Sequence, residues 1–187
     1  LVTSYRRLDE LAENLEKFSY RVLKEDCLDL PPKVFTTRIV ELTDDQKDKY
    51  VTMKRTAVAE HGGKIMSSMS ALTTLLRLHQ ITCGTFKADD GTITPLKNNR
   101  LTALLECLEE VEGKAIIWAT YREDIKNIVE TLKKLYGEDS TVEYHGGVDS
   151  TLRQDHITQF QDKTGPARFF VGNPQTGGYG ITLTAAN

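Results

Sequence analysis

The chain has 187 residues, a formal net charge of −3, 39% hydrophobic residues and 27% charged residues, which suits a globular protein with its own core. No run of about 18 apolar residues occurs, and the charged N-terminus lacks the apolar stretch of a secretory signal, so we expect neither a membrane span nor export. Three scattered cysteines without a CxxC pair argue against a disulfide framework and for a reducing compartment, the cytoplasm or, in a eukaryote, the nucleus. The histidines show no metal-ligand spacing with them, so no zinc site is expected.

The first 30 residues have helical periodicity, with Leu8, Leu11, Leu15 and Phe18 spaced to share one face. The sequence Leu30-Pro31-Pro32-Lys33 then breaks the helix, because proline removes a backbone donor and biases the preceding residue to extended geometry. We therefore predict a boundary there, between residues 1–30 and a domain of residues 31–187. The β-branched and aromatic stretch 34–40 predicts a strand.

A helical insertion is predicted over residues 43–95. Thr43 and Gln46 have the spacing of a capping box, which begins a helix that should run to about Glu60. An apolar stripe from Ile65 to Leu76 predicts a second helix that ends at Gly84. Residues 88–95 are polar and are expected to form a loop.

From about residue 96 the pattern alternates between helix and strand. Helical faces are expected at 101–113, 125–137 and 152–160, and strands at 115–119, 141–144 and 168–171. Such alternation is typical of a parallel sheet with helices on both faces, and the apolar run 115–119 indicates a strand buried on both faces. The fold class predicted is therefore α/β, with a sheet core over residues 96–187.

Polar and glycine residues follow each predicted strand, at Thr120-Tyr121-Arg122, His145-Gly146-Gly147 and Asn173 to Gly180. In parallel sheets ligands bind beyond the carboxyl ends of the strands, and glycine lets a phosphate or another backbone approach closely. Helices beginning near Ser150 and after Gly178 would add unpaired amides.

Each of these loops also has a plain structural interpretation as a turn. His145 is equally read as a capping residue, and Trp118 as a core residue. Arg122 and Arg153 are ordinary solvated charges unless the partner is a polyanion.

Features of a complete nucleotide hydrolase are missing from the sequence. It contains no G-x-x-x-x-G-K-[ST] loop and no acidic pair for Mg²⁺ at a strand end. The late G-G-x-G at residues 177–180 is a poor dinucleotide fingerprint, since no βαβ unit with a ribose-binding acid follows it. We therefore expect no catalytic residue and no metal ligand in this chain.

Several ordered blocks resemble one family, the second RecA-like lobe of the Swi/Snf-type ATPases within the superfamily-two helicases and translocases. The stretch 20–26 followed by LPPK at 30–33 is similar to the junction between the two lobes, and residues 42–50 match L-T-x-x-Q-x-x-x-Y. Residues 76–83 resemble the LRQIC helix, and residues 114–120 resemble motif IV. YHGG at 144–147 with Arg153-Gln154 is similar to the next motif, and residues 173–186 resemble motif V in their glycines and Leu-Thr-Ala-Ala tail.

The resemblance implies a lobe of an ATP-dependent double-stranded DNA translocase or remodelling helicase. It implies that ATP and Mg²⁺ are held mainly by a first lobe, and that this chain, which stops before motif VI and its arginine finger, is inactive alone. The residues expected to contact the DNA backbone are Thr120, Arg122, Gly146, Gly147, Arg153, Asn173 and Thr176. The residues expected to face the nucleotide are Gly177, Gly178 and Gly180.

Two alternatives stay open. The first is a non-catalytic docking module, in which helices between Thr43 and Gly84 bind another protein. The second is the lobe of an RNA helicase. The proline-proline junction and the LRLHQI helix argue against the RNA helicase, through the resemblance alone.

Overall fold

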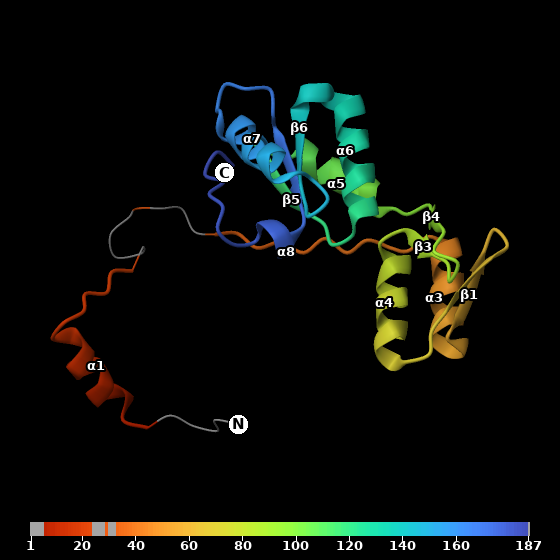
Figure 1. The fold of residues 1–187 in the computed structure, drawn as a ribbon, viewed down its shortest axis with the longest axis horizontal. Helices are drawn as coiled ribbons and strands as arrows, with labels where there is room; N and C mark the ends of the chain where they lie inside the picture. The colour runs from red at the N-terminus through yellow and green to blue at the C-terminus, as the bar shows by residue number, and fades with distance from the viewer. Residues whose placement is uncertain (1–5, 24–28, 30–32, 187) are drawn as a thin grey trace. The chain divides into compact units, whose positions relative to one another are not determined.

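The computed structural model describes residues 6–23, 29 and 33–186 and divides into two compact units, Leu1–Arg38 and Ile39–Asn187 (Figure 1). The first unit contains helix α1 (Leu8–Glu16), whose leucines are exposed. The helical prediction for the first 30 residues was too long, because the described residues from Ser19 to Leu23 are not helical. Residues 24–28 and 30–32, with the predicted proline boundary, lie outside the described residues.

The strand predicted at 34–40 does not form. These residues are extended, and Val34, Phe35 and Ile39 are 81%, 89% and 87% exposed. Strand propensity reflects how well a side chain packs on a pleated, half-buried surface, and among the described residues this stretch pairs with no neighbouring strand. The composition of residues 34–40 therefore indicates a strand propensity, but the segment does not become part of a sheet.

The insertion begins with α3 (Asp44–Thr56), and the predicted capping box at Thr43 and Gln46 is confirmed. The helix ends at Thr56 rather than near Glu60, since Ala57 adopts a left-handed conformation with φ 56°. An antiparallel hairpin follows, β1 (Val58–His61) with β2 (Lys64–Ser67), turning at two glycines of positive φ. Ile65, the first residue of the apolar stripe predicted to be helical, belongs to this hairpin.

The second helix of the insertion, α4 (Ala71–Thr82), is capped by the Ser70 side chain. A second hairpin, β3 (Thr85–Lys87) with β4 (Ile93–Pro95), occupies part of the stretch expected to be a loop. Helices and hairpins enclose a core of their own. It consists of Met53, Ala59, Met66, Leu78, Ile81, Phe86, Ala88 and Leu96.

Gly84 joins α4 to the second hairpin in a left-handed conformation with φ +82°, and a Cβ there would lie 2.1 Å from Asn98 Nδ2. We expect Gly84→Ala to lower the free energy of unfolding by about 2–3 kcal/mol, since a left-handed alanine costs about 1–2 kcal/mol before the Asn98 amide is displaced. Urea denaturation measures the loss. Gly91→Ala is the matched control, because Gly91 has φ +86° and nothing within 4 Å of its Cβ position. Equal losses in the two variants would show that the Asn98 contact is unimportant.

The sheet core confirms the predicted alternation. Three parallel strands are ordered β5 (Ala115–Trp118), β7 (Phe169–Gly172) and β6 (Thr141–Tyr144). The helices are α5 (Arg100–Glu109), α6 (Arg122–Tyr136), α7 (Ser150–Gln161) and the short α8 (Pro174–Gly177), with a 3₁₀ turn at Glu138–Ser140.

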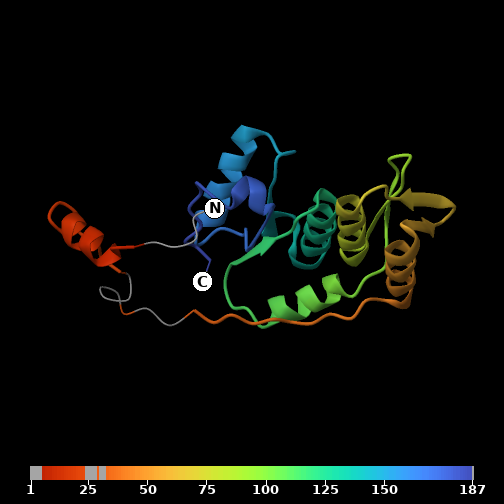
Figure 2. The ribbon, with the colours of Figure 1, turned by 90° about the horizontal axis from the view of Figure 1, so that it is seen from below.

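Alternate residues of the central strand β7 face opposite layers, as the pleat of a strand requires. Phe169 and Val171 pack with residues of α5 and α6, whereas Phe170 packs with Phe160 of α7. Figure 2 shows α5 and α7 on opposite sides of the sheet. The predicted fold class, a RecA-like parallel sheet covered on both faces with a helical insertion, is confirmed.

Strand β5 is less buried than its apolar run suggested, since only Ile117 among its four residues is fully buried and Trp118 is 42% exposed. The reason is its place in the sheet. One side pairs with β7, and the other carries a single bridge between Lys114 and Ala186. Within the described part of the chain, no helix has the length and apolarity needed to cross a bilayer.

Candidate nucleic-acid interface

The three strand-end loops leave the sheet at the same level. Trp118, Gly172 and Tyr144, the last residues of the three strands, are register partners. Because the strands are parallel, residues 119–122, 145–148 and 173–178 begin side by side on one edge (Figure 1). We call these loops the strand-end rim; their convergence was predicted from the sequence.

Asn173 ties the rim together. Its Nδ2 donates to the carbonyl oxygen of Thr120 at 2.7 Å. Its Oδ1 accepts from the backbone amide of Gln175 at 2.9 Å, and this hydrogen bond caps the N-terminus of α8. Its backbone amide donates to the carbonyl of Tyr144 at 2.9 Å. This one residue, predicted to contact DNA, therefore connects the third loop to the first loop and to the end of β6, from which the second loop begins.

Arg122, Gly146, Gly147 and Thr176 come together on the rim. A Cβ at Gly146 would lie 3.8 Å from Thr176 Oγ1 and 3.9 Å from Arg122 Nη2, and a Cβ at Gly147 would lie 3.5 Å from Arg122 Cζ. The exposed Arg122 guanidinium thus extends from the first residue of α6 over the second loop. The arrangement is a cation and a hydroxyl beside a backbone without side chains, which an anionic chain can approach closely.

His145 has the capping role that the sequence left open. Its Nδ1 accepts the Gly147 amide at 3.0 Å, and its Nε2 lies 3.4 Å from a carboxylate oxygen of Glu143. Arg153 lies on α7, as predicted from a helix beginning near Ser150, with its Cζ 5.8 Å from the centre of the Tyr144 ring. Its Nε is buried and has no hydrogen-bond partner within the described residues. Among the described residues, no observed contact links Arg153 to Arg122, Gly146, Gly147 or Thr176.

The glycines predicted to face a nucleotide differ from one another. Gly177 is buried, and a Cβ there would lie 3.0 Å from Trp118 ring carbons and 3.1 Å from Tyr144. A Cβ at Gly178 would lie 2.4 Å from the carbonyl oxygen of Pro174. Internal packing therefore explains both glycines. Gly180, with φ +77° and nothing within 4 Å, is the one of the three with open space.

The backbone amides of Gly177 and Gly178 are already bonded within the protein. The amides of Gly177 and Gly178 donate to the carbonyls of Asn173 and Pro174 at 2.9 and 2.8 Å. The helix expected after Gly178 is wrong, because α8 lies before that residue and residues 179–186 contain no helix. The Gly177 and Gly178 amides are therefore not free to bind a phosphate in this conformation.

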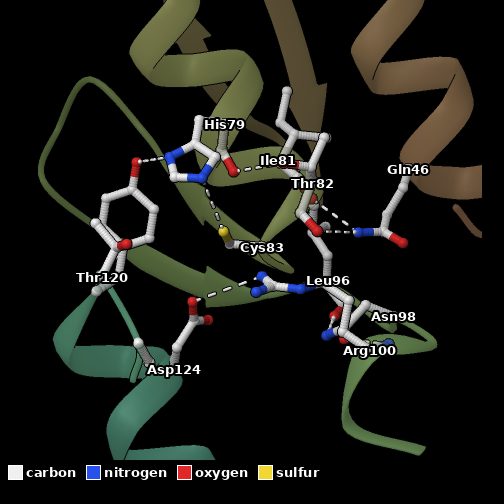
Figure 3. A network of polar contacts seen from close by, with 12 residues as sticks. Gln46, His79, Ile81, Thr82, Cys83, Leu96, Asn98, Arg100, Thr120 and Asp124 are labelled. Atoms are coloured by element: carbon white, nitrogen blue, oxygen red, sulfur yellow. Dashed lines mark hydrogen bonds and ion pairs between the residues drawn. The ribbon is translucent and has the colours of Figure 1, made fainter. Parts of the chain in front are cut away.

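A polar network between the insertion and the sheet core was missed by the sequence analysis (Figure 3). His79 Nδ1 lies 2.9 Å from the Tyr121 hydroxyl, and Arg100 lies 3.8 Å from the Asp124 carboxylate. Burial raises the pKa of the Asp124 carboxyl and of the Cys83 thiol, and the Arg100 guanidinium opposes both shifts. The only available signal was His79 itself, a polar residue on the outward face of α4 at helical spacing from Leu72, Leu75 and Leu76, which are exposed.

A cleft of about 380 Å³ adjoins this network. Apolar side chains of α5, β5 and α6 line it together with Cys83, Arg100 and Asp124. Its Trp118 wall was expected to be core, whereas this residue is partly exposed at the end of β5.

Comparisons with known proteins agree with this architecture. Residues 96–187 match the family described as helicase conserved C-terminal domain, and no curated protein matches the chain. The SWI2/SNF2 ATPase C-terminal domain of Sulfolobus solfataricus is similar, with 24% identity, a TM-score of 0.57 and coverage of 79% of this chain and 66% of that one.

Two longer structures from the same organism are also similar. The SWI2/SNF2 ATPase core domain has 23% identity, a TM-score of 0.57 and coverage of 99% of this chain and 40% of that one. The SWI2/SNF2 ATPase core in complex with dsDNA has 21% identity, a TM-score of 0.55 and coverage of 99% and 41%. The chain thus spans about two fifths of these cores, and the resemblance inferred from its motifs is confirmed. Residues 96–187 match the model of the helicase conserved C-terminal domain family, and the chain has a RecA-like fold similar to that of the SWI2/SNF2 ATPase C-terminal domain.

Proposed function

We propose that this chain is the second lobe of an ATP-driven translocase or remodelling helicase on double-stranded DNA, and that its strand-end rim grips the DNA backbone. The observation that carries the proposal is the convergence of three loops, distant along the chain, on one edge of the sheet. A structure of the same fold was solved in complex with dsDNA, which supports duplex DNA as the partner. The second partner is the first RecA-like lobe of the same protein.

The rim offers chemistry suited to phosphates rather than to bases. Arg122 supplies an exposed cation, Thr120 and Thr176 supply hydroxyls, and Gly146 and Gly147 leave the backbone open. Such contacts position a protein on DNA without reading sequence. Arg153 adds a second cation on α7, and Asn173 holds the loops in register.

The nucleotide would be held mainly by the first lobe. When bound there with Mg²⁺, ATP supplies the free energy for lobe movement. In this chain the segment around Gly180, supported by the packed Gly177 and Gly178, forms one side of the nucleotide cleft between the two lobes. Alone, the chain is expected to hydrolyse no ATP in the presence of saturating duplex DNA, and robust turnover by the purified chain would overturn this division of the site.

We expect Arg122→Ala to weaken duplex binding about fivefold to tenfold and to reduce the slope of log K against log salt by about 1, as the loss of one phosphate contact should. Arg153→Ala should act in the same direction. Fluorescence anisotropy with a labelled duplex at several salt concentrations measures both quantities.

Lys134→Ala is the matched control for Arg122→Ala. It removes the same charge from an exposed position of the same helix, roughly 18 Å along the axis at about 1.5 Å per residue. If both arginine variants bind like the Lys134 variant, the DNA-grip proposal fails, and a docking module becomes the better explanation.

A further inference from the structure

The insertion contacts the strand-end rim at one defined point. The C-terminal end of α4 lies beside the start of α6 (Figures 1 and 2), where His79 Nδ1 and the Tyr121 hydroxyl are 2.9 Å apart. Their rings are also in contact, with centroids 5.4 Å apart and planes tilted by 51°. Figure 3 shows the His79 ring on α4, with the dashed line that marks this contact leaving one of its nitrogens.

We infer that His79 is a positioning residue for the loop 119–122, so that the insertion sets the geometry with which Thr120 and Arg122 meet DNA. This rests on the proposed function for its consequence, although the positioning itself is a property of the free chain. Tyr121 stands between the two residues expected to contact the backbone. It is also the N-cap residue of α6, where its side chain makes no capping hydrogen bond.

The loop is held from two sides. On the sheet side, Asn173 Nδ2 donates to the Thr120 carbonyl at 2.7 Å. On the insertion side, His79 holds the next residue by its hydroxyl. A loop fixed at two successive residues from two different elements has little freedom to move, and releasing either contact frees it locally.

His79 itself has a firm base. Its neighbours Leu78 and Ile81 are buried in the core of the insertion. The end of α4 is tied to α3, because Gln46 Nε2 donates to the Ile81 carbonyl at 2.8 Å. His79 Nε2 lies 3.7 Å from Cys83 Sγ. A displacement of α4 would therefore be transmitted to Tyr121 rather than absorbed at the histidine.

The contact does not require a particular protonation state of the histidine. Imidazole nitrogens and a phenol hydroxyl can each donate or accept, so the pair persists for either tautomer and for the protonated ring. Burial, with the nearby Cys83 and Asp124, raises the pKa of Tyr121 above its ordinary value, so its hydroxyl, already protonated at neutral pH, stays so. His79 therefore acts as a fixed support.

Tyr121→Phe is the sharpest test, because it removes the hydroxyl and keeps the ring contact. In the free 187-residue chain we expect amide hydrogen exchange in residues 119–123 to accelerate, by about fivefold at Ala119, whose amide donates to the Gly172 carbonyl, the effect of losing one net hydrogen bond. Duplex affinity should fall twofold to fivefold, with a smaller salt slope. His79→Ala should reproduce both changes, and His79→Gln, which retains a donor and an acceptor, should restore them in part.

Leu75→Ala is the control, since Leu75 is 64% exposed and lies one turn before His79 on α4. It should leave exchange in residues 119–123 unchanged. Unchanged amide exchange in both the Tyr121 and His79 variants overturns the inference, whatever their affinity for duplex DNA. Faster exchange together with full DNA binding in Arg122→Ala supports the positioning and overturns the proposed function, so the two failures are distinguishable.

Discussion

Replacing Phe170 by alanine is expected to lower the free energy of unfolding of the sheet core by about 4 kcal/mol, the usual cost of removing a large, fully buried aromatic side chain. Phe170 is 0% exposed in the central strand β7. Its ring lies 5.4 Å from those of Tyr144 and Phe160 and 6.0 Å from that of Trp118. The cavity left by alanine would therefore be bordered by three aromatic rings from β5, β6 and α7.

Urea denaturation followed by tryptophan fluorescence measures this loss, since Trp118 is the single tryptophan and contacts Phe170. Phe35→Ala is the control, because the same atoms are removed from a side chain that is 89% exposed. A loss below about 1 kcal/mol in Phe170→Ala would mean that the three rings collapse onto the vacated space, contrary to the packing described.

Gly177→Val should cost about 2–3 kcal/mol and should also weaken duplex binding. The position is buried, and even a methyl group would lie 3.0 to 3.1 Å from rings of Trp118 and Tyr144, so a valine forces α8 away from the sheet. Movement of α8 displaces Asn173 and Thr176, which hold and line the strand-end rim. Stability and DNA affinity should therefore fall together.

Thr176→Val separates the two effects. It places the same residue on the same short helix at a half-buried position, where the main change is the loss of one hydroxyl. We expect its unfolding free energy to change by less than about 1 kcal/mol in a chemical denaturation curve. If Gly177→Val is as stable as this variant, the close packing of Trp118 on Gly177 is not what requires glycine there.

The sheet core was predictable because its pattern is repeated and its packing is local. The helical faces at 101–113 and 125–137 and the strands beside them are bounded by glycines and covered on one or both faces, so periodicity and burial agree. The insertion was harder to predict. Ile65 and Met66 read equally well as helix or strand, and only the left-handed turn at Ala57 and the glycine pair at 62–63 decide for a hairpin.

The site could be predicted in its location and not in its detail. Parallel strands bring their carboxyl ends together, so the convergence of three loops followed from the order of elements alone. Why Gly177 and Gly178 are glycines did not follow, because the answer is the approach of Trp118 and the Pro174 carbonyl, which depends on coordinates. The contact of His79 with Tyr121 joins residues 42 positions apart and has no local signature.

The core of the insertion, around Phe86 and Met53, shares no residue with the core of the sheet, which consists of one cluster around Phe169 and one around Phe170. In evolutionary terms, such separation lets substitutions accumulate in the first core without requiring compensation in the second. The insertion is thus free to diversify, or to be exchanged by a protein engineer, provided that the replacement still presents a hydrogen-bonding group to Tyr121.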